Sequence, residues 1–312
     1  MMIIVMAILA STLRLATPLI FASIGGVFTE RSGVVNIALE GIMIMGAFFA
    51  ILTFRYVPNP WVAILVAMTM GMLTSLILGV LAIHLRANQV VAGVAINLLA
   101  GSLAAYLLEV IYGRSGQTDP IRGGLSRSPE TLQFLNDIPV LGSFFSGLNP
   151  FVYLAFIVVI IAYFVLFKTP FGLRVRAVGE HPKAADTVGI NVYKIRYICV
   201  LISGALAGLA GASLSIGAVN MFREGMTSGK GFIALAAMIF GKWHPVGALL
   251  ACLFFGFAEA IEIQASTLGI GWIPSEFLRM LPYVATILVL VGAVGKAVAP
   301  KASGQPYDKA HH

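Results

Sequence analysis

The residues of this sequence that could do chemistry are polar and ionisable side chains inside long apolar segments. Asn36 and Glu40 fall in one such segment, Asn97 in another and Glu259 in a third. Ionisable groups in such segments are costly to bury in a membrane, so they usually face a cavity or a partner group. Their amide and carboxylate groups can donate to and accept from a neutral polar substrate. We therefore predict that these four residues line a substrate pathway.

A second interpretation stays open for the two asparagines, because such side chains also cross-link helices and stabilise membrane bundles. Asn36 and Glu40 are four residues apart, a spacing that predicts one shared helical face. Arg14 lies about halfway along the first apolar segment. It would pair with Glu40, pair with a glutamate of another subunit, or extend to an interface.

Apolar segments long enough to cross a bilayer must position these side chains. Hydrophobic residues make up 59% of the 312 residues and charged residues 11%, against roughly 25% charged in a soluble domain. Because about 20 apolar residues span a bilayer, the sequence predicts nine spans, at 2–26, 37–55, 61–84, 90–112, 151–167, 196–219, 231–241, 245–265 and 278–298. The seventh is too short to span alone, so it would either borrow residues from 222–230 or re-enter as a half-helix.

The segment 168–196 is the one long polar stretch rich in Lys and Arg, and apolar segments flank it on both sides. Short loops of this composition stay on the cytoplasmic side. With 168–196 inside, alternating spans place twelve Lys and Arg inside and six outside, which predicts an outer N-terminus and an inner C-terminus. The net charge of +7 does not indicate nucleic-acid binding, because the basic residues are spread over loops between spans.

The predicted organisation is a single transmembrane domain over 1–299 with a polar, disordered cytoplasmic tail at 300–312. Within the domain, 168–196 is the cytoplasmic loop and 112–150 is a nearly neutral extracellular loop rich in Gly, Ser and Pro.

A weak internal repeat relates Gly33–Met43, GVVNIALEGIM, to Gly229–Ile239, GKGFIALAAMI. The predicted topology makes the two copies inverted, a feature typical of transporters whose site lies between the repeats. The predicted fold is therefore an all-α polytopic membrane protein of about nine transmembrane segments with an inverted internal repeat.

Three stretches carry a resemblance to a known family: TERSGVVNIALEGIMIMGAFFA (29–50), ANQVVAGVAINLLA (87–100) and GLRVRAVGEHPKAADTVGINV (172–192). The chain resembles the permease subunits of bacterial ABC importers of the branched-chain amino acid/ribose type, and within them the nucleoside-importer branch. The resemblance implies a type II ABC importer-like fold and a multi-pass location in the bacterial plasma (inner) membrane.

The resemblance also implies a coupling role for part of 168–196, in which short helices dock in a groove of the ATPase. The matching positions are Gly179, Glu180, His181, Pro182, Ala184, Ala185 and Gly189. The implied partners are an ABC ATPase subunit, a second homologous permease in a heterodimer, an extracellular or lipid-anchored substrate-binding protein, a nucleoside substrate and membrane lipid, with no nucleic acid.

The sequence gives no sign of an ATPase site of its own. It contains no G-x-x-x-x-G-K-[ST] motif, and Lys230 in SGKG lacks the spaced first glycine and the following Ser or Thr. Nor do the histidines and cysteines suggest a catalytic or metal site. We therefore expect no enzyme activity and no cofactor bound by this chain, with ATP and Mg used by the partner ATPase.

Two alternatives remain open from the sequence. A secondary transporter or channel would use Glu40, Glu259 and Glu262 as proton or ion sites. An ABC permease of the same kind would instead carry sugars or branched-chain amino acids. The long basic segment favours an ATPase-driven permease, since a secondary transporter does not require a cytoplasmic docking element.

Overall fold

The structure is a computed structural model of the chain, and it describes residues 2–125, 148–267 and 298–308. The regular secondary structure of this part of the chain is helical apart from one isolated β-bridge between Gln117 and Arg223. Its α-helices are α1 (Met2–Arg31), α2 (Leu39–Tyr56), α3 (Pro60–Gly79), α4 (Gln89–Tyr112), α6 (Pro150–Lys168), α7 (Pro170–Glu180), α8 (Pro182–Thr187), α9 (Val192–Leu214), α10 (Lys230–Phe240) and α11 (Pro245–Thr267). Two π-helices, η1 (Val80–His84) and η3 (Ser215–Val219), continue α3 and α9.

Local sequence signals fix where several of these helices begin. Asn or Thr side chains accept a hydrogen bond from the first-turn backbone and so satisfy one of the N–H groups that a helix leaves unpaired. Proline follows directly at the start of α3, α6 and α7, where its missing N–H costs nothing. The capping residues of α3, α4, α6, α7 and α9 are Asn59, Asn88, Asn149, Thr169 and Asn191.

Seven of the described helical segments are long and apolar enough to cross a membrane, and they agree with seven of the nine predicted spans. The predicted seventh span is α10, which has 11 residues and is therefore only about 16 Å long. The predicted ninth span, 278–298, lies outside the described residues except for its last residue. The total of nine therefore stays a prediction.

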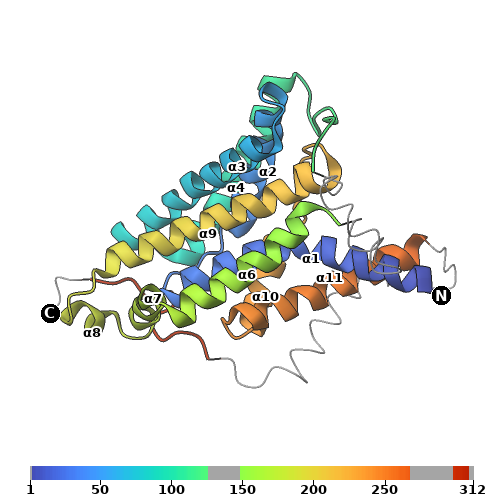
Figure 1. Cartoon of the computed structure of the whole chain (residues 1–312). Helices are drawn as coiled ribbons and strands as arrows, with labels where there is room; N and C mark the ends of the chain where they lie inside the picture. The colour runs from blue at the N-terminus through green and yellow to red at the C-terminus, as the bar shows by residue number, and fades with distance from the viewer. Residues whose placement is uncertain (1, 126–147, 268–297, 309–312) are drawn as a thin grey trace.

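Helices α1 and α9 lie at the centre of the bundle (Figure 1). Helices α2 and α3 pack against one side of α9, and α4 packs on α2, whereas α6, α10 and α11 gather around α1. The span that contains α9 is 67% buried, against 28% for α4. Large apolar side chains such as Leu98 on α4 and Ile160 on α6 are more than two-thirds exposed, at 69% and 68%. These outer faces suit lipid contact.

Small residues let α9 approach its two neighbours at backbone distance. A Cβ atom added at Gly208 would clash with the carbonyl oxygen of Ala67 on α3, and one at Gly211 would clash with the carbonyl oxygen of Met43 on α2. Close backbone approach through small residues is a common way for membrane helices to associate. The central position of α9 therefore depends on these glycines.

The bundle has two ends, and different charged loops lie at each of them. At one end Arg31 donates to the carbonyl oxygens of Lys242 and Trp243, and Arg86 pairs with Asp308. At the other end the segment around Gln117 pairs with the segment around Arg223. The chain thus passes between the two ends through 220–229 and α10 together.

Two basic residues lie elsewhere than the sequence indicated. Lys230, assigned to an outer loop, is 8% exposed inside the bundle, because it begins a half-helix rather than preceding a full span. Arg196, assigned to the cytoplasmic loop, is 1% exposed, because α9 already begins at Val192. The tail is a third difference, since its described residues 298–308 pack against the end of the bundle that holds Arg31 and Arg86 instead of being disordered.

The glycine contacts of α9 give a direct test. Gly208→Ala should lower the unfolding free energy of the purified protein by about 1–3 kcal/mol, since the added methyl group overpacks a backbone contact. Gly101→Ala on α4 is the matched control, because nothing lies within 4 Å of its added Cβ. Thermal unfolding in detergent should show the loss for Gly208→Ala alone, and an equal response of both variants would contradict the packing.

Candidate substrate pathway and coupling surface

Helices α2 and α10 meet at their first turns inside the bundle. The carboxylate of Glu40, in the first turn of α2, accepts hydrogen bonds from the backbone N–H groups of Gly229 (2.8 Å) and Gly231 (2.6 Å) at the start of α10. These N–H groups belong to the set that no intrahelical partner can satisfy. A negative charge is also favourable at a helix N-terminus. Glu40 therefore acts as the cap of a helix that the sequence places nearly 200 residues away.

Asn97 of α4 does the same for α2. Its side-chain oxygen accepts from the N–H of Gly41 (2.7 Å), and its amide group donates to the carbonyl oxygen of Ile37 (2.9 Å). Non-helical backbone inside a membrane bundle needs such partners, because no water is present to satisfy it. Asn97 thus fastens the break between α1 and α2 to the neighbouring helix.

Asn36 lies in this break and is fully buried. It accepts from the N–H of Ala38 (3.1 Å) and donates to the hydroxyl of Ser203 on α9 (2.9 Å). The prediction that it shares a helical face with Glu40 is wrong, because α2 begins only at Leu39. Its contacts match the alternative interpretation, in which asparagine cross-links helices. A role for Asn36 and Asn97 in the substrate pathway stays a prediction.

Glu259 of α11 forms an ion pair with Lys230, the first residue of α10. The ammonium nitrogen lies 2.6 and 2.7 Å from the two carboxylate oxygens, and the side chains are 10% and 27% exposed. Lys230 thereby connects Glu259 to the helix start that Glu40 caps. The sequence analysis dismissed Lys230 as a phosphate site and missed this role. The sequence signal that could have revealed it is a lysine directly before the short apolar segment 231–241, where a cation needs an acidic partner.

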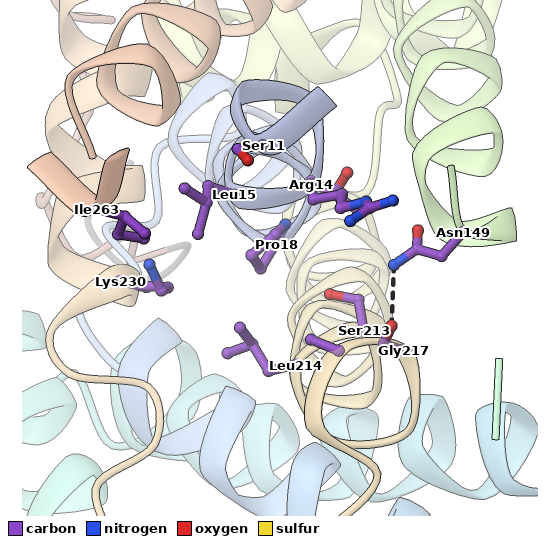
Figure 2. Close-up of a pocket in the computed structure, with 12 residues that line it drawn as sticks. Ser11, Arg14, Leu15, Pro18, Asn149, Ser213, Leu214, Gly217, Lys230 and Ile263 are labelled. Atoms are coloured by element: carbon purple, nitrogen blue, oxygen red, sulfur yellow. Dashed lines mark hydrogen bonds between the residues drawn. The ribbon is translucent and has the colours of Figure 1, made fainter. Parts of the chain in front are cut away.

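A cavity of about 260 Å³ adjoins Lys230 (Figure 2). This volume is just below the roughly 300–1,000 Å³ typical of small-molecule sites. Asn149, at the start of α6, forms part of the wall and donates to the carbonyl oxygen of Gly217 (3.0 Å). The lining mixes hydroxyl, amide and basic groups with aliphatic ones: Ser11, Arg14, Leu15, Thr17, Pro18, Asn149, Ser213, Leu214, Gly217, Ala218, Lys230 and Ile263. Of the four predicted pathway residues, Glu259 is the one whose ion-pair partner lines this cavity.

The predicted coupling segment folds as two helices, α7 and α8, joined at His181 and followed by a turn into α9. Gly179 and Ala185 are buried, and a side chain at Gly179 would clash with the carbonyl oxygen of Arg31. Their role is to seat the two helices on the bundle. The remaining positions are at least partly accessible: Glu180, His181, Pro182, Ala184 and Gly189.

Val188 extends this accessible surface and was not singled out from the sequence. It is 74% exposed in the turn after α8, beside Gly189, whose φ of +83° suits glycine. A single exposed aliphatic side chain is common on protein surfaces, so Val188 by itself does not identify a contact. Among the described residues, no group of three or more His, Cys, Asp or Glu side chains could hold a metal ion.

Seven apolar spans, a half-helix that begins inside the bundle, and a two-helix element at one end define a multi-pass membrane protein. The comparison with family models agrees. Residues 8–290 match the family described as "Branched-chain amino acid transport system / permease component", and the chain belongs to that family.

Three relatives are similar over most of their length. The guanosine ABC transporter permease NupQ of Bacillus subtilis is 50% identical over 310 residues, covering 97% of this chain and 96% of the relative. The nucleoside ABC transporter permease NupC of Lactococcus lactis is 45% identical over 311 residues, with the same coverage. The guanosine permease NupP of Bacillus subtilis is 27% identical over 290 residues, or 90% of this chain and 80% of that protein.

The cap on α10 predicts a stability effect. Glu40→Gln should destabilise the folded protein by about 1–2 kcal/mol, since a neutral amide replaces a carboxylate that caps two backbone donors. Glu109→Gln, on the exposed surface of α4, should leave the unfolding temperature unchanged. If both variants unfold like the parent, Glu40 does not hold the α2–α10 junction.

The Lys230–Glu259 pair predicts strong non-additivity. Lys230→Met should cost about 3 kcal/mol, because it leaves a poorly solvated carboxylate without its cation. Adding Glu259→Met should recover part of that loss. A double-mutant cycle by thermal unfolding measures the coupling, with the exposed Arg114–Asp119 pair as a control expected to contribute less than about 1 kcal/mol. Additive losses at Lys230 and Glu259 would contradict the ion pair.

Proposed function

We propose that this chain is a permease subunit of an ATP-driven ABC importer that carries nucleosides into the cytoplasm. The observation that carries the proposal is the 50% and 45% identity, over nearly the whole chain, to permeases named for guanosine and nucleosides. NupP, a second guanosine permease of the same Bacillus, is longer and less similar. This difference supports a heterodimer in which our chain is the shorter permease.

The chemistry of the cavity supports an uncharged, hydrogen-bonding substrate. Ser11, Thr17 and Asn149 bring hydroxyl and amide groups to its wall, and Leu15 and Leu214 add apolar surface. Lys230 is paired with Glu259, so these two charges largely cancel. Arg14, the other basic residue of the wall, also has an interaction partner. A nucleoside has ribose hydroxyls and base edges for the polar groups and a flat base for the apolar ones, and it carries no phosphate that would need a surplus of positive charge.

The proton- or ion-coupled alternative is less well supported by the glutamates it would use. The Glu40 carboxylate caps α10, and the Glu259 carboxylate is held by Lys230. Glu262 also has an interaction partner. Groups committed to fixed partners are poorly placed to bind and release a coupling ion during each cycle.

The mechanism we propose is alternating access around the α2–α10 junction. The two helices start at the same place. Helix α2 leads to the end that holds Gln117 and Arg223, which is the proposed outer end. Helix α10 leads to the end that holds Arg31, which is the proposed inner end. This arrangement is what an inverted repeat with interrupted helices would produce. Closure of the ATPase on ATP and Mg would move α7 and α8, and the permease halves would rock about the junction to release substrate inward.

The proposed orientation places 168–196 and the tail in the cytoplasm and 112–150 outside the plasma membrane. The paired segments around Gln117 and Arg223 would then face a substrate-binding protein, whether extracellular or lipid-anchored. On the opposite side, α8 and Val188 would face the ATPase subunit. The chain would use no cofactor of its own.

Uptake by the intact system tests both the substrate and the cavity. Cells that carry this permease with its partner subunits should accumulate labelled guanosine or another nucleoside faster than glucose or leucine. Ala218→Phe should lower uptake per assembled complex about tenfold or more, since the ring fills the cavity. Val219→Phe is the matched control at the next position, which is 50% exposed and does not line the cavity. Transport of glucose or leucine but no nucleoside would overturn the substrate assignment.

A further inference from the structure

The C-terminal tail, defined here as residues 300–308, is bound to the inner end of the bundle along its length. The N–H of Ala302 donates to the carbonyl oxygen of Gly179 at the end of α7 (2.9 Å). The N–H of Gly304 donates to the carbonyl oxygen of Gly33 in the break between α1 and α2 (3.2 Å). The tail therefore joins the coupling helices to the segment that leads into α2.

Two arginines hold the distal half of the tail in place. The buried Arg196 donates to the carbonyl oxygens of Ser32 (3.2 Å) and Gln305 (3.1 Å). Arg86 binds both carboxylate oxygens of Asp308, at 2.5 and 2.8 Å. A bidentate guanidinium–carboxylate pair fixes orientation as well as distance.

Tyr307 anchors the same stretch by its side chain. It is 4% exposed, and its ring lies 5.5 Å from that of Tyr193 between centroids. Fixing nine residues costs conformational entropy that exposed polar chain ends rarely offset. The arginine contacts and the burial of the Tyr307 ring offset this entropy cost. The tail is therefore an ordered part of this end of the bundle.

A groove of about 590 Å³ runs between the tail and the coupling helices. Lys183 and His181 lie on one wall and Lys301 on the other, all of them exposed. The acidic groups are Glu180 and Asp308, and the charge of Asp308 is neutralised by Arg86. The groove is therefore basic on balance, and one of its walls includes predicted coupling positions.

We propose that the tail forms the second wall of the surface on which the ATPase subunit docks, and that the groove receives an acidic segment of that subunit. This inference rests on the proposed function, which supplies the ATPase as partner. The first wall is the predicted coupling segment at 180–184, and residues of this segment and of the tail line the same groove. A partner that seats on α8 would contact Lys301 and the exposed Gln305 side chain at the same time.

Cross-linking in the assembled complex tests the placement. Gln305→Cys and Ala184→Cys should both cross-link to the co-expressed ATPase subunit through a short bifunctional maleimide. Lys242→Cys, exposed at the same end of the bundle but outside the groove, should not. Background is low because the native Cys199 and Cys252 are fully buried. A cross-link from Ala184→Cys without one from Gln305→Cys would overturn the tail proposal and leave the importer assignment intact.

Charge reversal tests the chemistry of the groove. Lys301→Glu should weaken binding of the purified ATPase subunit to the reconstituted permease pair about tenfold at low salt, and less as salt is raised. Lys242→Glu changes the same charge at the same end and should bind like the parent. Equal binding by Lys301→Glu and the parent would overturn the acidic-segment proposal. Failure of the unaltered permease pair to bind any ATPase would overturn the proposed function and, with it, the docking surface.

Discussion

The backbone N–H groups at the starts of α2 and α10 have to be satisfied inside an apolar bundle, and much of the structure follows from that constraint. Each unsatisfied group would cost several kcal/mol where water is absent. Glu40 supplies acceptors for α10, and Asn97 supplies them for α2. Because the first residue of α10 is Lys230, the same junction brings a cation inward and needs Glu259 to balance it. The intramembrane charges are thus tied to one architectural feature, the meeting of two helix ends.

A polar residue at this junction can both hold the helices in place and face the cavity. A junction of half-helices leaves backbone and side-chain dipoles beside a cavity, where Lys230 is shared between the ion pair and the cavity wall. Close packing around α9 keeps the junction fixed, since Gly208 and Gly211 remove the side chains that would separate the helices. A rigid bundle on either side of a polar break is well suited to rocking between two states.

At the proposed inner end, three arginines make structural contacts, although the sequence places them in or beside loops. Arg196 is buried beneath the tail, Arg31 binds the carbonyl oxygens that follow α10, and Arg86 holds Asp308. The guanidinium group can reach several carbonyl oxygens at once because its donors form a planar fork. Arg196 and Arg86 hold the tail, which in turn donates a hydrogen bond to the end of α7, so the proposed docking surface comes from two distant parts of the chain.

The sequence by itself determined the membrane class and seven of the spans, because apolar length is a local signal. The basic stretch at 168–196, which holds α7 and α8, stood out for the same reason. Whether the short seventh segment crosses or re-enters was left open. The sequence also singled out Glu40 and Glu259, since carboxylates in apolar segments are conspicuous. Only the tertiary structure decided what those groups contact. Asn36 lies outside α2, Lys230 is buried, and residues 300–308 are packed rather than disordered. Each of these outcomes depends on partners between about 30 and 270 residues away along the chain. Local composition carries no information about such partners, because a buried hydrogen bond or ion pair forms only once the whole bundle has brought its two halves together.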